Sequence, residues 1–480
     1  MQVQSMNFKA RATEKLADVR LQSTLAKVKG NFIDKRAKAI TQLDDFEGTR
    51  QAAVAIRDNV LNNLDVWLEA FEKNAIARGA TVYWAENAEE VNRLVIDIAR
   101  RHDCKKAIKA KSMVSEETAL NDALTAAGIT PIETDLGEYV VQISHSTPSH
   151  IIAPIVHLSK EEVSELFEKI HHLPRKTDIT EMTHEARGIL RPHFLDAEMG
   201  ISGGNFFIAE TGSVALFSNE GNIRMSTTMP KVHVAISGIE KVVPTLEDFS
   251  TLARLLPRSA TGQSISNYVS LLTGPHADDE LDGPEHMYFI LVDNGRTGLV
   301  GSDLQEMLRC IRCGACMNHC PVYHHIGGHA YGWVYPGPMG SVLTPAYVGI
   351  ENAIDLPNAS TLCGECHVVC PVKIPLPDLL RKLREKQVDR KLRPMLERIA
   401  LTVWSWAAQR PAFYAFGSKI AMRMLSKMSN KNNMIENLPF GAGWSAGRDF
   451  PAPAGRTFRE LYAEKNRRAT PSQTTATQKS

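Results

Sequence analysis

A repeated cysteine motif constrains this chain more than any other feature of its sequence. Seven of the eight cysteines lie between residues 310 and 371. They form two runs with the spacings Cys-x2-Cys-x2-Cys-x3-Cys-Pro and Cys-x2-Cys-x3-Cys-Pro: Cys310, Cys313, Cys316 and Cys320, then Cys363, Cys366 and Cys370. Thiolates held at this spacing on a tightly turning backbone are typical of two-cluster bacterial ferredoxins. The motif therefore predicts two iron–sulfur clusters.

The spacing also predicts how the ligands divide between the two clusters. In two-cluster ferredoxins, the cysteine before proline ligates the cluster of the other run. The first [4Fe-4S] cluster would be bound by Cys310, Cys313, Cys316 and Cys370, and the second by Cys320, Cys363 and Cys366. Iron would be held through these cysteines, and the stretch would carry electrons.

The second cluster lacks one expected thiolate. Three residues before Cys363, where a complete motif has a cysteine, stands Ser360. A serine hydroxyl is a hard ligand and a poor match for iron in a thiolate field. Four interpretations stay open: Ser360 ligates the fourth iron, His367 does, water does, or the site holds a [3Fe-4S] cluster.

The sequence disfavours other uses of the cysteines. The chain starts without an apolar secretory segment, so disulfides are not expected, and zinc sites usually close with two Cys-x2-Cys pairs. The remaining cysteine, Cys104, is expected as a small buried apolar residue. No window holds 18 apolar residues, which predicts a cytoplasmic protein without a transmembrane segment.

Charge is distributed unevenly along the chain. The formal net charge is +1, yet residues 373–480 contain 21 Lys or Arg against 8 Asp or Glu. This basic segment could offset the negative charge of the clusters, dock an acidic redox partner, or form an ordinary solvated surface. Nucleic acid is not an expected partner, because no zinc finger, aromatic RNA platform or basic zipper accompanies the charge.

Hydrophobic periodicity predicts several domains. Apolar residues recur at helical spacing near the N-terminus, and strands then alternate with single helices, which favours a parallel α/β sheet. The polar, low-complexity end is expected to be disordered. The expected parts are an N-terminal helical arm (1–75), an α/β domain (76–297), a two-cluster ferredoxin-type domain (298–390), a helical and irregular segment (391–465) and a disordered tail (466–480).

Several local predictions accompany this division. Residues 210–212 are expected to form a hairpin turn, residues 115–127 a single helix and residues 139–143 a short strand. Residues 323–345, dense in Gly, Pro, Tyr and His, are expected to form a loop that wraps the clusters and shields them from water. Arg57 is expected as a surface or capping residue.

Signatures of nucleotide cofactors are absent from the sequence. No Gly-x-Gly-x-x-Gly follows a predicted strand, and no phosphate loop ends in Gly-Lys-Ser/Thr. A hydride acceptor is therefore not visible. Two one-electron clusters suit electron transfer between a two-electron site and a distant acceptor.

Motifs in the α/β domain carry a resemblance to a known family. They begin at Glu133 (ETDLGEY), Pro148 (PSHIIAP), Ala209 (AETG), Asn219 (NEGNIR) and Gly238 (GIEKVVP). Residues 79–292 resemble the lactate-utilisation domain through these motifs. Joined to the double cysteine motif and a C-terminal stretch with Gly-Trp and Arg-Asp-Phe-Pro, the chain resembles the lactate utilisation protein B family over nearly its whole length.

This resemblance implies an iron–sulfur subunit of a three-part bacterial system that oxidises L-lactate to pyruvate. The chain would then be an electron-transfer component of an L-lactate dehydrogenase complex. Its partners would be the other subunits of the lactate-utilisation system and an electron donor or acceptor protein. Serine at position 360 also fits this family.

The resemblance further implies a fold related to sugar-phosphate isomerases and coenzyme A transferases, followed by a mainly α-helical ferredoxin-type domain. Coenzyme A transferases use a glutamate nucleophile in a Ser-Glu-Asn-Gly loop, which residues 218–222 match approximately. The catalytic candidates are Glu220, with Arg224 to clamp a carboxylate and His233 as base. A small hydroxy acid is the candidate ligand.

Two alternatives to electron transfer stay open. An acyl-transferase-like or phosphosugar enzyme of this fold could carry the clusters as structural or sensing elements. A binding module could instead sense redox state through the clusters and contact an acidic partner through the basic C-terminal region.

Overall fold

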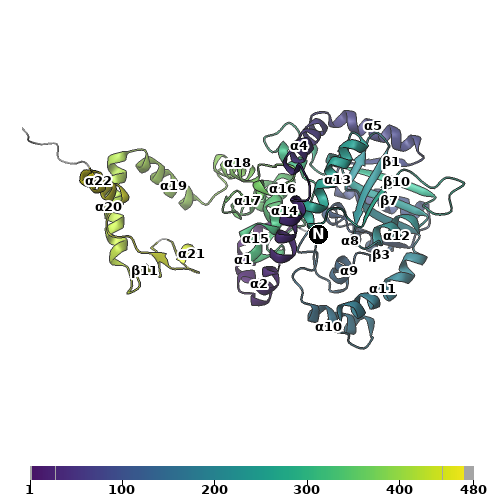
Figure 1. Ribbon diagram of the computed structural model, residues 1–480, viewed down its shortest axis with the longest axis horizontal. Helices are drawn as coiled ribbons and strands as arrows, with labels where there is room; N and C mark the ends of the chain where they lie inside the picture. The colour runs from purple at the N-terminus through teal and green to yellow at the C-terminus, as the bar shows by residue number, and fades with distance from the viewer. Residues whose placement is uncertain (1–2, 28, 440, 446, 470–480) are drawn as a thin grey trace, which may run out of the picture. The chain divides into compact units, whose positions relative to one another are not determined.

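The structure is a computed structural model that describes residues 3–27, 29–439, 441–445 and 447–469 (Figure 1). The chain divides into two compact units, Met1–Arg390 and Lys391–Ser480. All eight cysteines and the predicted α/β domain belong to the first unit. The first unit therefore positions the candidate site.

The first unit begins with a series of helices, in agreement with the helical periodicity of its sequence. The fifth helix buries Leu64, Leu68, Phe71 and Ala75 on one face, and the Phe71 ring packs edge-on against Phe289 of the central sheet, with centroids 5.3 Å apart. The elements are a 3-10 turn (Ser5–Asn7), α1 (Phe8–Leu16), α2 (Val19–Ala26), a π-helical turn (Lys29–Ile33), α3 (Asp34–Ile40), α4 (Phe46–Asn62) and α5 (Leu64–Ala77).

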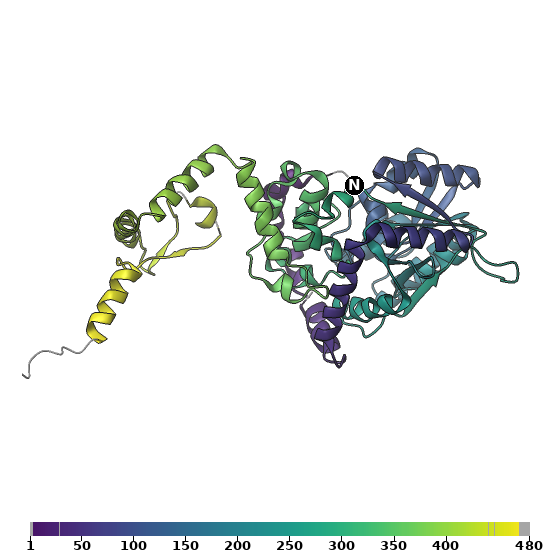
Figure 2. The ribbon, with the colours of Figure 1, turned by 90° about the horizontal axis from the view of Figure 1, so that it is seen from above.

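Six parallel strands form the central sheet, in the order β1-β10-β7-β4-β2-β3. Helices cover both faces of this sheet (Figure 2), and its central strands are almost wholly apolar and buried, as expected for strands covered on both sides. The predicted parallel sheet is confirmed. The strands are β1 (Thr81–Ala85), β2 (Lys106–Lys109), β3 (Thr130–Glu133), β4 (Met199–Gly203), β7 (Val232–Gly238) and β10 (His286–Val292).

Most of the helices in this domain begin at a side-chain cap, whereas α8 and α12 do not. The Asn87 side chain accepts the Glu90 N–H at the start of α6, and Ser159 and Glu162 form a capping box at the start of α10. Such caps satisfy N–H groups that have no partner within the helix. The helices are α6 (Ala88–Arg101), α7 (Met113–Glu117), α8 (Leu120–Ala126), α9 (Leu136–Ile143), α10 (Lys160–His171), α11 (Ile179–Asp196), α12 (Asn222–Thr228) and α13 (Leu246–Ala260).

The chain reverses its direction of travel across the sheet between β2 and β4. From β2 it continues outward to β3, whereas from β4 it continues the other way to β7 and β10. In open parallel sheets, such a reversal leaves a crevice at the carboxyl ends of the two strands, because their loops diverge there. This edge of the sheet is where a ligand site is expected.

A smaller four-stranded sheet, in the order β8-β5-β6-β9, shares a core with α5. The hairpin turn predicted at residues 210–212 joins β5 to β6 and is confirmed. Gly212 in this turn has a φ of +67°, and an added Cβ would stand 2.3 Å from the Ala75 nitrogen, so only glycine fits. The strands are β5 (Phe206–Ile208), β6 (Ser213–Ser218), β8 (Val242–Val243) and β9 (Tyr268–Leu272).

Two local predictions in the α/β domain are wrong. Residues 139–143 lie in helix α9, because the Asp135 side chain accepts two backbone N–H groups and starts a helix there. The single helix expected over 115–127 is two helices, α7 and α8, separated at Ala119 with a φ of +54°. A short apolar run does not by itself distinguish helix from strand.

The loop expected at residues 323–345 is also wrong in form. It contains two helices and a 3-10 turn, α15 (Pro321–Ile326), His329–Tyr331 and α16 (Gly337–Val348). Three tyrosine side chains of this segment, Tyr323, Tyr331 and Tyr335, are completely buried. The Gly and Pro residues signalled a loop, but burial of these aromatic rings orders the segment instead.

Short elements carry the cysteines and connect them to the end of the first unit. Cys316 lies on α14 and Cys366 on α17. Cys310 and Cys320 cap an element, and Cys370 lies in the segment between α17 and α18. The elements are the 3-10 turns Ile239–Lys241, Thr297–Leu299, Gln305–Arg309, Ile350–Ala353 and Leu356–Asn358, and helices α14 (Ala315–Asn318), α17 (Glu365–Val368) and α18 (Leu376–Asp389).

The second unit is mainly helical. The first two helices bury none of their residues, although both are rich in apolar side chains. No helix of the described residues is long and apolar enough to cross a membrane. Of the predicted tail, residues 466–469 end a helix and 470–480 lie outside the described residues. The elements are α19 (Met395–Ala408), α20 (Pro411–Lys427), β11 (Met434–Ile435), α21 (Ala442–Ser445), β12 (Phe450–Pro451) and α22 (Phe458–Ala469).

Candidate functional site

The structure brings four of the predicted ligands together around a small apolar cavity. We call these side chains the first thiol group, and the space between them the thiol cavity. The other cavity walls are mostly apolar, including Met307, Met339 and Leu376. The first thiol group consists of Cys310, Cys313, Cys316 and Cys370.

Burial, with repulsion from neighbouring thiols, raises the pKa of three thiols of this group, Cys313, Cys316 and Cys370. The pKa of Cys313 is raised to about 12 by burial and then by Cys370, and the pKa of Cys370 is raised to about 11 by burial. Burial and four neighbouring thiols, Cys310 first and Cys366 of the second run among them, also raise the pKa of Cys316. Four thiols at such a site are a suitable donor set for a metal cluster that binds thiolates.

Backbone amides are directed at the sulfur atoms of the first thiol group. The Arg312 N–H donates to Cys310 Sγ and the Ile374 N–H donates to Cys370 Sγ, each at 3.4 Å. Hydrogen bonds of this kind stabilise negative charge on cluster sulfurs and tune their reduction potential. Arg312 adopts a left-handed φ of +59° between two of the cysteines, which is uncommon for a residue with a side chain.

Buried cations surround the first thiol group. Lys241 Nζ donates to the Cys310 carbonyl at 2.8 Å, Arg36 donates to the Val369 carbonyl at 2.8 Å, and Arg50 donates to the Cys370 carbonyl at 2.7 Å. Burial, then Arg312, lowers the pKa of Lys241 to about 7. These cations lie where negative charge on a cluster would develop.

Arg57 is the most deeply placed of these cations, and its prediction as a surface or capping residue is wrong. Its guanidinium is completely buried and donates to the Val242 and Leu308 carbonyls at 3.0 Å each, and to the Glu240 carbonyl. Burial lowers the pKa of Arg57 to about 10, whereas Glu240 and then the Cys310 thiol raise it. It ties α4 to both the sheet and the cysteine segment.

A buried ion-pair network links the same segment to the sheet edge. Arg296 donates to both carboxylate oxygens of Glu117 at 3.0 Å and to Glu240 at 2.8 Å. Burial alone would raise the pKa of Glu240, but Arg296 and other cations lower it to about 2. Arg312 lies 3.5 Å from the same carboxylate and stacks over Tyr335.

Three further cysteines, Cys320, Cys363 and Cys366, form a second thiol group. Burial raises the pKa of Cys320, and the Cys363 thiol raises it further. The pKa of Cys366 is raised to about 12, first by burial and then by the Cys320 thiol. Cys363 is exposed. Backbone N–H groups of Val322 and Tyr323 donate to Cys320. Cys366 also raises the pKa of Cys316, so the two thiol groups adjoin. The assignment of the seven cysteines to two clusters stays a prediction.

Ser360 lies beside the second thiol group in sequence, and its hydroxyl accepts the Leu362 N–H at 3.1 Å. His367 donates through Nδ1 to the Ile374 carbonyl at 3.0 Å. Among the described residues, no three His, Cys, Asp or Glu side chains are arranged to hold a single metal ion. A cluster instead distributes its cysteines over several iron atoms.

A larger cavity of about 300 Å³ lies at the carboxyl ends of the central strands; we call it the sheet-edge cavity. Residues after β2, β3, β4 and β7 line it, so it occupies the crevice predicted by the chain reversal. It shares three wall residues with the thiol cavity, namely Ile151, Ile311 and Arg312. The first thiol group therefore borders the cavity.

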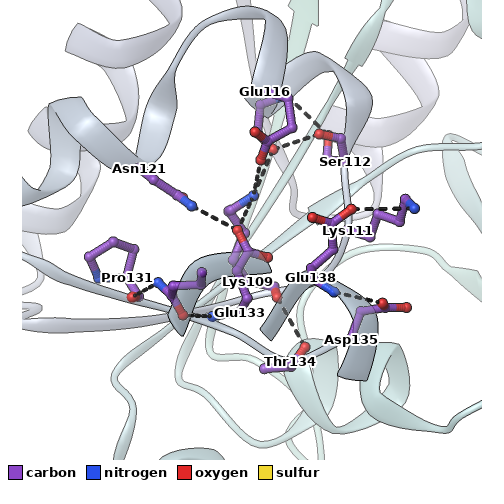
Figure 3. Close-up of polar contacts among 12 residues, drawn as sticks. Lys109, Lys111, Ser112, Glu116, Asn121, Pro131, Glu133, Thr134, Asp135 and Glu138 are labelled. Atoms are coloured by element: carbon purple, nitrogen blue, oxygen red, sulfur yellow. Dashed lines mark hydrogen bonds and ion pairs between the residues drawn. The ribbon is translucent and has the colours of Figure 1, made fainter. Parts of the chain in front are cut away.

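A network of charged side chains lies at one side of the sheet-edge cavity (Figure 3). Lys109 Nζ contacts Glu133 at 2.7 Å and Glu116 at 3.3 Å. Burial would lower the pKa of Lys109, but Glu133 raises it above its ordinary value. Lys111 Nζ lies 3.3 Å from Glu138, whose pKa burial raises to about 7.

The three predicted catalytic residues do not meet. Glu220 lines the sheet-edge cavity and accepts the Leu136 N–H at 3.1 Å, and burial followed by Asp135 raises its pKa to about 7. Arg224 is exposed on α12, with its guanidinium 5.7 Å from the Tyr268 ring centre, outside the cavity lining.

His233 lies within the sheet, away from the cavity lining. It is completely buried on β7, its Nε2 lies 2.8 Å from the Ser202 hydroxyl, and burial lowers its pKa to about 3. Sequence reasoning missed Lys111 and Arg312, which do line the cavity. The position of Lys111 just beyond a predicted parallel strand was the available signal. Cys104 is buried, as predicted.

These features define a class of protein: a parallel α/β domain whose ligand edge borders a double thiol site of iron–sulfur type. Comparison with known families agrees with this class. Residues 68–292 match the LUD domain, residues 306–374 the 4Fe-4S dicluster domain and residues 380–467 the C-terminal domain of lactate utilisation protein B. The second match places the motif cysteines in an iron–sulfur domain.

Curated relatives extend over almost the whole chain. Lactate utilization protein B of Macrococcus caseolyticus is 41% identical over 472 residues, covering 98% of this chain and 99% of the relative. Its counterpart in Bacillus cytotoxicus is 40% identical over 465 residues, covering 97% and 98%. The chain belongs to the lactate utilisation protein B family.

A solved structure of a DUF162 family protein from Deinococcus radiodurans is 14% identical and covers 48% of this chain and 98% of its own. The TM-score is 0.27, which is too low to assign a shared fold.

Proposed function

We propose that this chain is the iron–sulfur electron-transfer subunit of a multi-protein system that oxidises L-lactate to pyruvate. The observation that carries the proposal is the division of seven cysteines into two adjoining thiol groups, one of which borders a ligand-sized cavity. Membership of the lactate utilisation protein B family supplies the substrate class. The bound clusters would supply one-electron transfer between a two-electron oxidation and a partner protein.

The proposed ligands follow the two thiol groups. Cys310, Cys313, Cys316 and Cys370 would hold the first [4Fe-4S] cluster, and Cys320, Cys363 and Cys366 the second, with Ser360 as a candidate fourth ligand. The first set is supported by backbone donors to Cys310 and Cys370 and by the effect of Cys310, Cys313 and Cys370 on the pKa of Cys316, which Cys366 also raises. The thiols of Cys320 and Cys363 that raise the pKa of Cys366 support the second.

The protein's own charges suit a site that gains electrons. Arg36, Arg57, Lys241 and Arg312 each interact favourably with a thiol of the first group in its charged form. Fixed positive charge lowers the cost of adding an electron to a buried cluster. The first cluster is therefore expected to have the higher reduction potential.

The finer fold and the domain limits are part of the same proposal. A parallel sheet with a ligand cavity at its carboxyl edge supports the relation to sugar-phosphate isomerases and coenzyme A transferases. The helical arm would span 1–75, the α/β domain 76–297 and the two-cluster domain 298–390, ending where the first unit ends. The remaining parts would be 391–465 and 466–480, and the location cytoplasmic.

The second unit supports contact with a protein partner. Helices α19 and α20 bury none of their residues and expose Trp404, Trp406, Phe413 and Phe416, while residues 373–480 carry an excess of positive charge. Exposed aromatic side chains beside basic residues are typical of protein interfaces. We propose that an acidic subunit of the lactate-utilising system docks here and exchanges electrons with the clusters.

The test of this function is anaerobic reduction of the purified holoprotein by L-lactate in the presence of its partner subunits. Visible absorption should bleach only when partners and L-lactate are both present. Iron analysis should give about eight iron atoms per chain for two cubanes, or about seven if the second site holds three. A full complement of partners that produces no bleaching would refute the electron-transfer role.

One observation favours a second candidate, an acyl-transferase-like or phosphosugar enzyme with structural or sensing clusters. Glu220 faces the sheet-edge cavity with a raised pKa, which suits a carboxylate nucleophile or base. In that case Cys310→Ala would keep activity and Glu220→Gln would remove it. Electron transfer predicts the loss of lactate-dependent reduction in Cys310→Ala.

A further inference from the structure

We propose that the sheet-edge cavity binds a small 2-hydroxy- or 2-oxocarboxylate, with its carboxylate against Lys111 and Arg312. The inference rests on the proposed function, because it places the substrate class of the system inside this subunit. It replaces the residues that the sequence suggested, since Arg224 and His233 do not line the cavity. Its volume of about 300 Å³ is at the lower end for ligand sites, which suits a small acid.

The position of the cavity is the first argument. Gly203 and Gly204 at the end of β4, Ser237 at the end of β7 and Lys111 beyond β2 all line it. Ligands of open parallel sheets bind at this edge where the chain reverses. The cavity therefore lies where this type of fold offers loops and backbone groups to a ligand.

The positive charge of Lys111 is the second argument. Lys111 Nζ lies 3.3 Å from Glu138, but it makes no hydrogen bond within the described part of the chain. An ammonium group has three donors, so Lys111 can bind an anion. Lys111 lines the sheet-edge cavity, and its Nζ is a buried donor with no hydrogen-bond partner in the described residues.

Arg312 offers a second cationic contact. Its Nη2 lies 3.5 Å from Glu240, a carboxylate already bound by Arg296 at 2.8 Å. The Arg312 guanidinium lies over the Tyr335 ring, with its carbon 4.9 Å from the ring centre. A planar guanidinium fixed in this way keeps donors for a carboxylate.

The other walls suit the rest of a hydroxy acid. Glu220 and Asp135 line the same cavity, so a ligand hydroxyl can donate to a carboxylate there. Burial and then Asp135 raise the pKa of Glu220, and Lys111 lowers it in part. A carboxylate with a raised pKa is suited to accept a proton. Apolar Ile151 and Ile311 offer contacts for a methyl group.

Arg312 also connects the ligand site to the first thiol group. Its side chain lines the sheet-edge cavity, while its backbone N–H donates to Cys310 Sγ at 3.4 Å. Ile151 and Ile311 complete the wall between the two cavities. A ligand here would lie against the first cluster rather than the second.

The test is calorimetric binding of oxamate, a redox-inert 2-oxo acid amide, to the anaerobic full-length holoprotein. Oxamate should bind. Acetate, which has no oxygen on the carbon next to its carboxylate, should bind about tenfold more weakly. Lys111→Met should weaken oxamate binding about tenfold or more, and Lys111→Arg should restore most of it. Lys105→Met, at the exposed opposite end of β2, is the matched control and should bind as the unchanged chain does.

A second variant guards against a folding defect in Lys111→Met. Ser266→Phe adds a ring at a half-buried wall position of the cavity without changing charge, and should abolish oxamate binding while iron content is kept. Oxamate should also shift the electron paramagnetic resonance signal of the first cluster, observed alone in Cys363→Ala. Failure of oxamate to bind the unchanged chain at millimolar concentration would overturn the site, as would unchanged binding in both variants.

Failure of the site and failure of the function give different results. Oxamate binding that depends on Lys111, without lactate-driven reduction in the presence of partners, would refute the proposed function and keep the site. Lactate-driven reduction that is unaffected by Ser266→Phe would refute the site and keep the function.

Discussion

The two thiol groups come from one repeated motif but lie in contrasting surroundings. The first borders a ligand cavity and is surrounded by Arg36, Arg57 and Lys241, all buried. The second includes the exposed Cys363, and the pKa of Cys366 is shifted by burial first and then by the Cys320 and Cys363 thiols, with no cation among the causes. Similar ligand spacing therefore gives two sites of different electrostatics, because the fold and not the motif determines which charges meet each site.

The largest expected difference is the effect of losing one ligand from each site. Cys370→Ala should remove roughly four iron atoms per chain and markedly lower the thermal midpoint, since the first group lies in the buried part of the unit. Cys363→Ala should remove a similar amount of iron with a much smaller change in midpoint. Iron analysis and thermal unfolding by circular dichroism measure both effects. If both variants lowered the thermal midpoint by the same amount, the two sites would not differ in their contribution to stability.

Next in size is the effect of removing a buried cation beside the first group. Arg57→Met should lower the free energy of unfolding by about 3–5 kcal/mol, because it leaves the Val242 and Leu308 carbonyls without a donor. It should also lower the reduction potential of the first cluster and leave the second unchanged. Chemical denaturation and a redox titration report these changes.

The control for Arg57→Met is Arg93→Met, a cation with exposed ion pairs on α6. Its loss should change the free energy of unfolding by less than about 1 kcal/mol. If the Arg57→Met variant shifts both cluster potentials equally, the first site is not the one that this charge tunes.

A smaller effect is expected from completing the second site. Ser360→Cys restores the missing motif cysteine and should raise iron content by about one atom per chain if the second site holds three iron atoms. It should also slow loss of iron in air. Ser360→Ala is the matched change without a thiol. Iron content that is the same in the parent and both variants would indicate that position 360 does not ligate iron.

The smallest expected effect is the pH dependence of oxamate binding beside the first group. Glu220 has a pKa of about 7, so it gains negative charge as pH rises through 7, and Lys241, with a pKa also near 7, loses positive charge. Both changes oppose an anionic ligand, so the dissociation constant should rise severalfold from pH 6 to pH 8. Glu220→Gln should flatten this rise in part, as measured by calorimetry across that range.

The local sequence already determined the parallel sheet, and the cysteine spacing by itself carries the prediction of two ligand sets. The cysteine motif extends over only a few residues, and the apolar pattern of each strand reflects its burial on both faces. Both patterns can therefore be recognised in the sequence without knowledge of the fold. The turn at residues 210–212 could also be predicted from nearby residues alone. The conformation of residues 139–143 could not, because the Asp135 cap and helix packing competed with a strand-like apolar run.

Only the tertiary structure decided which charged groups meet the thiols and the cavity. Arg57 reaches the Leu308 carbonyl across 251 positions of sequence, and no local pattern distinguishes such an arginine from a surface one. Lys111 and Arg312 line one cavity although they are 201 positions apart in sequence, because the cysteine segment packs against the carboxyl edge of the sheet. Long-range packing fixes these distances, so the sequence could name the cysteines but not the cations and cavity that make the two sites unequal.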